Sequence, residues 1–177
     1  LLARLGSSDP VEPFAAVEAV AQAFDLSRFG TAPIKLDPAD LAPLSARLLR
    51  AKPYEDAARG LAELGADPDT AEALWQAVSP NLDRLSDAAA WIALVRDGAQ
   101  AKVAPEDAAF VRAALALLPP RPWDAATWSD WTAAAKAAAS EAGAPRKGRA
   151  LFLPLRRALT GRDAGPDMGA LMPLLTR

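Results

Sequence analysis

The sequence predicts an all-α protein, and three observations support this class. Much of the 51% of residues that are hydrophobic is alanine, the best helix former and a poor strand former. The 16 prolines stand mostly where helices would begin or end. Apolar residues recur at helical spacing, as in the segment 151–159. The 177 residues suffice to bury a core, in one large domain or two small ones.

The first part of the chain is expected to hold six helices with recognisable ends. Asp9, Asp37, Asp69 and Asp87 stand at their starts, where a carboxylate accepts from free amides and faces the positive end of the helix dipole. Gly98 follows a helix and would stop it. The expected helices span about 11–24, 37–49, 53–64, 69–78, 87–95 and 105–118.

A proline-rich linker at 118–123 follows the sixth helix. Three prolines in four residues cannot continue a helix, so we place a boundary there between subdomains 1–118 and 119–177. Asp124 then caps a helix over 125–142, with Trp128 and Trp131 on one side. At this spacing the two tryptophans are more typical of a core than of a surface for stacking bases.

Positive charge is concentrated in the stretch 145–162. No acid occurs between Ala142 and Asp163, where six Lys or Arg are found, and the whole chain sums to −2, so the rest carries −8. Its apolar residues form a helical stripe, and the arginines at 149, 156 and 157 are expected to face solvent. Pro154 predicts a kink or a restart, and Gly161 a left-handed cap.

Composition excludes several kinds of chemistry. The chain has no Cys and no His, which removes thiol nucleophiles, disulfides, the usual zinc sites and the commonest general base. The acids are explained by helix caps, so we expect no catalytic residue and no metal site, and the chain alone is not expected to be an enzyme. No apolar run approaches the ~20 residues of a membrane span, which favours a cytoplasmic protein. The opening residues read as the end of an earlier helix, so we expect a fragment of a longer chain.

Several phrases of this sequence resemble bacterial glutamyl-tRNA synthetases. The phrase K-G-R-A-L-F-L-P-L-R-R-A-L-T-G at 147–161 is similar to a signature of their C-terminal anticodon-binding region. F-D-L-S-R-F-G-T-A-P at 24–33 and V-S-P-N-L-D-R-L at 78–85 resemble two further phrases, in the same order. L-S-A-R-L-L at 44–49 stands where members of this family commonly carry L-N-x-x-L-L. The departures are Ser45 for Asn, Ser79 for Arg and Ala164 for His.

The resemblance implies an all-helical cage in two subdomains, of the class I synthetase anticodon-binding type. It implies a parent enzyme that attaches glutamate to transfer RNA, using ATP and Mg in an N-terminal catalytic domain that is absent from this chain. No cofactor is then expected here. The implied partners are glutamate-accepting transfer RNA and the missing catalytic domain. The chain is expected not to associate with a membrane and to be a monomer.

Seven residues are the predicted RNA contacts under this resemblance. Asn81 and Arg84 are expected near the anticodon loop. The predicted contacts to the RNA backbone are Arg146, Lys147, Arg149, Arg156 and Arg162. Arg156 has a specific alternative, which is to pair with an acid of a neighbouring helix and serve structure alone.

Two other functions stay open at this point. The chain could be a helical protein-interaction module, or an orphan paralogue that no longer binds RNA; Ser79, Ala164 and the absence of His favour this. A basic patch broken up by acids from neighbouring helices would favour it too. The helical anticodon domain of class I lysyl-tRNA synthetases is similar in architecture, but the ending A-L-T-G argues against it.

Overall fold

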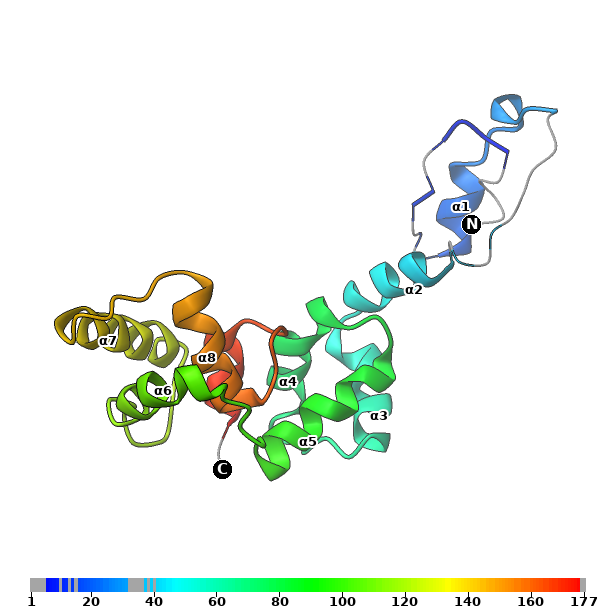
Figure 1. Ribbon diagram of the computed structural model, residues 1–177. Helices are drawn as coiled ribbons and strands as arrows, with labels where there is room; N and C mark the ends of the chain where they lie inside the picture. Colours follow the sequence, from blue (N-terminus) through cyan, green and yellow to red (C-terminus); the bar gives the residue numbers. More distant parts are fainter. Residues whose placement is uncertain are drawn as a thin grey trace.

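The computed structural model describes residues 6–9, 11–12, 14, 16–31, 37, 39 and 41–175. Over these residues the chain forms α-helices, short 3-10 turns and a single isolated bridge between Ser7 and Phe29, with no sheet. The all-α prediction is therefore confirmed. Figure 1 shows two groups of helices side by side, with α2 leading from one of them toward the N-terminal segment.

The described elements of the N-terminal segment contribute little to the core. They are α1 (Val17–Gln22) and the 3-10 turn η2 (Leu26–Arg28), and neither contains a buried residue. The helix expected at 11–24 is thus shorter, although residues 10, 13 and 15 lie outside the described part. Most of the helix start expected at 37–40 also lies outside it, and the following helix is described from Leu41 onward.

The first helical body is built from residues 41–97. Its elements in order are α2 (Leu41–Arg50), α3 (Tyr54–Glu63), α4 (Ala71–Val78), η4 (Ser79–Asn81), η5 (Leu85–Ala88) and α5 (Ala89–Asp97). Leu61, Leu74 and Val78 are almost fully buried at its centre. Trp75 joins this core and donates from Nε1 to the carbonyl oxygen of Lys52 at 3.1 Å, which fixes the turn between α2 and α3.

The second body is a bundle of three helices. It contains η6 (Pro105–Asp107), α6 (Ala108–Leu115), α7 (Thr127–Glu141) and α8 (Arg149–Thr160). Trp131 is 1% exposed and donates from Nε1 to the carbonyl oxygen of Ala114 at 2.6 Å. Trp128 is half-buried, with its ring centroid 5.7 Å from that of Trp131. The prediction that both tryptophans belong to a core is confirmed.

The end of the chain returns to the first body. The last elements are α9 (Met168–Leu171) and η7 (Met172–Leu174), and Leu171 and Met172 are fully buried in the core of α3, α4 and α5. The core of the first body therefore contains residues from both sides of position 118. The two packing clusters each combine residues from both sides of that position. The division of the chain into 1–118 and 119–177 stays a prediction.

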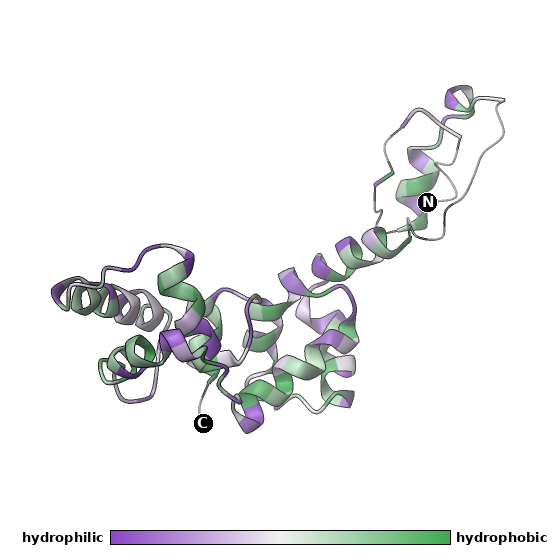
Figure 2. Cartoon of the chain, in the orientation of Figure 1, coloured by the Kyte–Doolittle hydropathy of each residue, from purple (hydrophilic) through white to green (hydrophobic). Residues whose placement is uncertain are grey.

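The helix α8 runs without interruption from Arg149 to Thr160, across the buried Pro154, so the chain does not restart there. Gly161 follows with φ 67°, which confirms the predicted left-handed cap. Figure 2 shows hydrophobic residues concentrated on the helices of both bodies and hydrophilic residues on the loop between α7 and α8. None of the helices in the described ranges has the length and hydrophobicity needed to cross a lipid bilayer.

Candidate nucleic-acid interface

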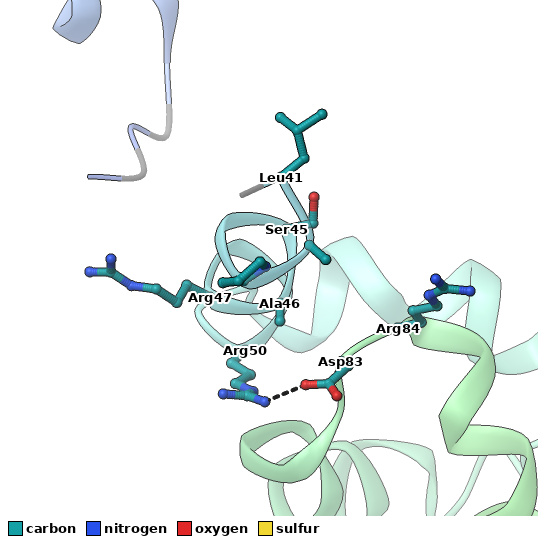
Figure 3. A pocket seen from close by; sticks show the side chains of 9 residues that line it. Leu41, Ser45, Ala46, Arg47, Arg50, Asp83 and Arg84 are labelled. Carbon is teal, nitrogen blue, oxygen red and sulfur yellow. Dashed lines mark hydrogen bonds and ion pairs between the residues drawn. The ribbon is translucent and has the colours of Figure 1, made fainter. Parts of the chain in front are cut away.

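An open groove lies between α2 and the turn that connects η4 to η5. Its volume is about 830 Å³. Two phrases that are far apart in the sequence meet here, L-S-A-R-L-L of α2 and the L-D-R that ends the P-N-L-D-R phrase. The lining residues are Leu41, Ala42, Pro43, Ser45, Ala46, Arg47, Arg50, Asp83 and Arg84, and Figure 3 shows the charged ones.

Arg50 ties the two sides of the groove together. Its Nε donates to the carbonyl oxygen of Leu82 at 2.9 Å, and its Nη2 donates to Asp83 Oδ1 at 2.6 Å (Figure 3). From the other side, Asp87 Oδ2 accepts from the backbone amides of Arg84 at 2.9 Å and Asp83 at 3.3 Å. The turn 82–84 is therefore held in one conformation by residues on both of its flanks.

Arg47 and Arg84 are exposed cations of the groove that, unlike Arg50, are not held by Asp83. They project on opposite sides of Asp83 in Figure 3, and neither forms an ion pair with any residue in the described part of the chain. With Arg50 and Asp83 included, the groove carries a net charge of +2. Arg84 is a sequence-predicted contact, whereas Arg47 was not predicted, although the L-S-A-R-L-L phrase contains it.

The turn at Pro80 and Asn81 is less accessible to a ligand than its resemblance to the family phrase suggests. Asn81 is exposed at the end of η4 but does not line the groove. Ser79, where the related phrase has Arg, is buried at 7% exposure. The positive charge of the groove comes instead from α2 and from Arg84.

The basic stretch 145–162 is less uniform in space than in sequence. Arg146 is half-buried, forms an ion pair with Asp107, lies 4.4 Å from the ring centroid of Phe110 and donates to the carbonyl oxygen of Ala150 at 3.1 Å. The charge of Arg146 is thus largely neutralised by an acid that precedes α6 in the chain.

Arg156 and Arg157 are both half-buried, so the expectation that they face solvent is wrong. Arg156 Nη2 donates to the carbonyl oxygen of Pro166 at 2.9 Å, and its buried Nη1 has no partner. Burial lowers the pKa of Arg156, and the nearby Asp167 opposes this shift. The structural alternative for Arg156 therefore has a carbonyl oxygen as its direct partner, with an acid close by.

Arg157 is paired even more tightly. Its Nε and Nη2 donate to the two carboxylate oxygens of Asp163, each at 2.6 Å. The hydrogen bonds raise the pKa of Arg157 and lower the pKa of Asp163. This bidentate pair closes the loop that follows α8 and leaves little charge available to a ligand.

Three predicted contacts of the basic stretch stay exposed. Lys147 and Arg149 flank Gly148 at the start of α8. Arg162 is exposed and its guanidinium lies 4.7 Å from the ring centroid of Trp91. These three, with Arg47 and Arg84, are cations that a polyanion can reach.

Comparison with known proteins gives one consistent result. The chain is 51% identical over 175 residues to "Glutamate--tRNA ligase 1" of Roseobacter denitrificans, across 99% of this chain and 38% of the relative. It is 48% identical over 177 residues to "Glutamate--tRNA ligase 2" of Dinoroseobacter shibae, and 47% over 174 residues to "Glutamate--tRNA ligase 2" of a Jannaschia species. This chain is homologous to the C-terminal part of glutamate–tRNA ligases.

The chain spans 38% to 39% of the length of these relatives. No model of a protein family matches it. The exposed cations described above form two sets in this homologue of the C-terminal part of glutamate–tRNA ligases. One is Arg47 and Arg84 in the groove, and the other is Lys147, Arg149 and Arg162.

Proposed function

We propose that this chain binds the anticodon arm of glutamate-accepting transfer RNA. The groove between α2 and the turn 82–84 carries the proposal, because it is open, has a net charge of +2 and is built from two of the phrases that resemble anticodon-binding sequences. The homology to glutamate–tRNA ligases supports transfer RNA as the partner.

The groove suits unpaired nucleotides on physical grounds. Proteins read RNA loops by stacking splayed bases on flat or apolar groups and by contacting phosphates and base edges. Arg47 and Arg84 supply two exposed guanidinium groups, while Leu41, which is 46% exposed, and Pro43 supply apolar surface.

The exposed cations near α8 would act as a phosphate clamp. Lys147, Arg149 and Arg162 are available for backbone contacts, which orient RNA without reading its sequence. Arg146 and Arg156 remain predicted contacts, but their partners within the protein compete with RNA for them. Asn81 remains a predicted contact beside the groove.

The attachment of glutamate to transfer RNA would take place in a part of the ligase outside this chain. ATP and Mg would be bound there, and this chain would hold the anticodon arm so that the acceptor end reaches the active site. We further propose that the protein acts as a monomer in the cytoplasm.

A second function has one observation in its favour. Asp107 and Asp163, from outside the uninterrupted basic stretch, neutralise Arg146 and Arg157. A basic patch broken up in this way fits a protein-interaction module, or an orphan paralogue that has lost RNA binding.

The experiment that separates these functions is binding of the 177-residue chain to glutamate-accepting transfer RNA and to a control transfer RNA, at low and moderate salt. We expect a preference for the glutamate-accepting RNA that persists at moderate salt and falls about tenfold in Arg84→Ala. Arg59→Ala is the matched control, because Arg59 is 93% exposed on α3 and lies outside the groove.

Two other outcomes of this binding experiment would change the assignment. Equal, salt-sensitive binding of both RNAs would reduce the role to a basic clamp. An absence of binding at low salt, by a chain whose helical circular dichroism is intact, would contradict the RNA function and favour the interaction module.

A further inference from the structure

We infer that Asp83 selects the nucleobase in the groove, by accepting a hydrogen bond from an exocyclic amine and rejecting uracil. The inference rests on the proposed function and adds a specificity to it. It derives from the placement of one carboxylate among three guanidinium groups.

The carboxylate of Asp83 is exposed but firmly held. Its side chain is 76% exposed, and Oδ1 accepts from Arg50 Nη2 at 2.6 Å. No hydrogen bond of Oδ2 is found with the residues that the structure describes. One oxygen is therefore bonded to Arg50 (Figure 3), and the other stays available on an exposed side chain that lines the groove.

The position of this oxygen is restrained through Arg50 and through the backbone of the turn. Arg50 is itself anchored to the Leu82 carbonyl oxygen, and Asp87 fixes the backbone amide of Asp83. An acceptor that is already in place loses little conformational entropy when a ligand binds. The arrangement thus provides a preorganised acceptor in a groove whose overall charge attracts an anion.

A carboxylate can only accept hydrogen bonds at neutral pH. Cytosine and adenine carry an amine on the edge that is open in unpaired RNA, and this amine donates to a carboxylate. Uracil presents a carbonyl oxygen at the corresponding position, which would face Asp83 Oδ2 without a proton between them. The N3–H of uracil, next to that oxygen on the same edge, reaches Oδ2 only if the base shifts, so the selection requires a base that the groove holds in one place. Since Arg50 already occupies Oδ1, the site suits a single amine better than the two-donor edge of guanine.

The flanking arginines explain why RNA would enter with this orientation. Arg47 and Arg84 point away from Asp83, to the two sides of the view in Figure 3, and we infer that they contact phosphates on either side of the base whose edge meets the carboxylate. Besides its structural contact with Arg50, Asp83 would repel an isolated anion, so the groove suits a ligand that also has donors.

The test uses anticodon stem-loop RNAs of glutamate-accepting transfer RNA in which each loop cytosine or adenine is changed singly to uracil. For the unmodified chain, we expect one position at which the change weakens binding by about tenfold. In Asp83→Asn that loss should disappear or reverse, because the amide can turn its NH₂ toward the uracil oxygen. Asp69→Asn is the matched control, as Asp69 is an exposed acid outside the groove, and it should keep the discrimination.

Two results would overturn the inference. If Asp83→Asn binds all the RNAs with the same pattern as the unmodified chain, Asp83 does not read a base, while the proposed RNA function stands. If the unmodified chain binds the whole set equally, the groove has no base specificity. Failure to bind any of these RNAs at low salt would instead remove the proposed function, and the inference with it.

Discussion

Arg146 donates a hydrogen bond from Nη1 to the carbonyl oxygen of Ala150, over 3.1 Å. In a regular helix that oxygen accepts from the amide four residues later, but residue 154 is proline and has no amide hydrogen. The guanidinium of Arg146 supplies the missing donor, while also pairing with Asp107. This explains how α8 passes through Pro154 without a break.

The first prediction tests this relationship with a double-mutant cycle. Pro154→Ala gives Ala150 a backbone donor again, so Arg146→Ala should cost less free energy of unfolding in that background than in the unmodified chain. We expect a coupling of about 1 kcal/mol, the usual net value of one hydrogen bond. Urea unfolding of the four chains measures it. Equal costs of Arg146→Ala in both backgrounds would show that the Ala150 contact contributes nothing, and exposed Arg149→Ala should be additive with Pro154→Ala.

The second prediction compares two glycines with similar backbone angles. Gly161 has φ 67° and Gly143 has φ 73°, so alanine at either site adopts a left-handed conformation that costs about 1 kcal/mol. A Cβ at Gly161 would lie 2.5 Å from the carbonyl oxygen of Gln100, whereas nothing lies within 4 Å at Gly143. Gly161→Ala should therefore destabilise the chain by at least about 1 kcal/mol more than Gly143→Ala in urea unfolding. Similar losses would mean that the Gln100 contact relaxes freely.

The third prediction concerns acid sensitivity at the start of α7. Asp124 Oδ1 accepts from Thr127 Oγ1 at 2.7 Å, from the Thr127 amide at 2.8 Å and from the Ala126 amide at 3.0 Å, and these bonds lower the pKa of Asp124. A lowered pKa in the folded state means that the stabilisation is complete above the unfolded pKa of about 3.9 and is lost as the pH falls through the folded value.

The melting temperatures of the unmodified chain and Asp124→Asn, measured from pH 7 to pH 2, check this directly. Their difference should be widest above about pH 4 and should narrow below it. Glu141→Gln, an exposed change at the other end of α7, is the control and should show no such narrowing. A difference for Asp124→Asn that does not change with pH would contradict the assignment.

The fourth prediction separates two arginines of α8 that look alike in the sequence. Arg149 is exposed, whereas Arg157 is held by both oxygens of Asp163. In binding to glutamate-accepting transfer RNA, Arg149→Ala should lower the affinity and reduce the slope of log affinity against log salt by about 1, the value of one phosphate contact. Arg157→Ala should leave that slope nearly unchanged. The reverse order would show that RNA binding displaces Asp163.

The helices themselves were largely predictable from the sequence because their signals are local. Asp124 and Gly143 enclose a segment rich in alanine, and the helix expected at 125–142 is found at Thr127–Glu141. The core position of Trp131 followed from helical spacing alone. Each of these features depends on residues within a few turns of one another.

The distribution of usable positive charge was not predictable in the same way. The stretch 145–162 contains no acid between its cations, but Asp107 reaches Arg146 across 39 positions of the sequence. Likewise, Arg50 and Asp83 are 33 positions apart, so neither the groove nor the role of Arg50 in it could be seen before the fold. Ion pairs between distant segments decide which cations remain available.

The most direct measurement is hydroxyl-radical footprinting of glutamate-accepting transfer RNA bound to the 177-residue chain. Binding of the anticodon arm predicts protection of riboses in the anticodon loop and its stem, with the loop protection reduced in a chain that carries both Arg47→Ala and Arg84→Ala. Protection confined to the acceptor stem, or a loop footprint that is identical in the double variant, would contradict the assignment of the groove as the anticodon site.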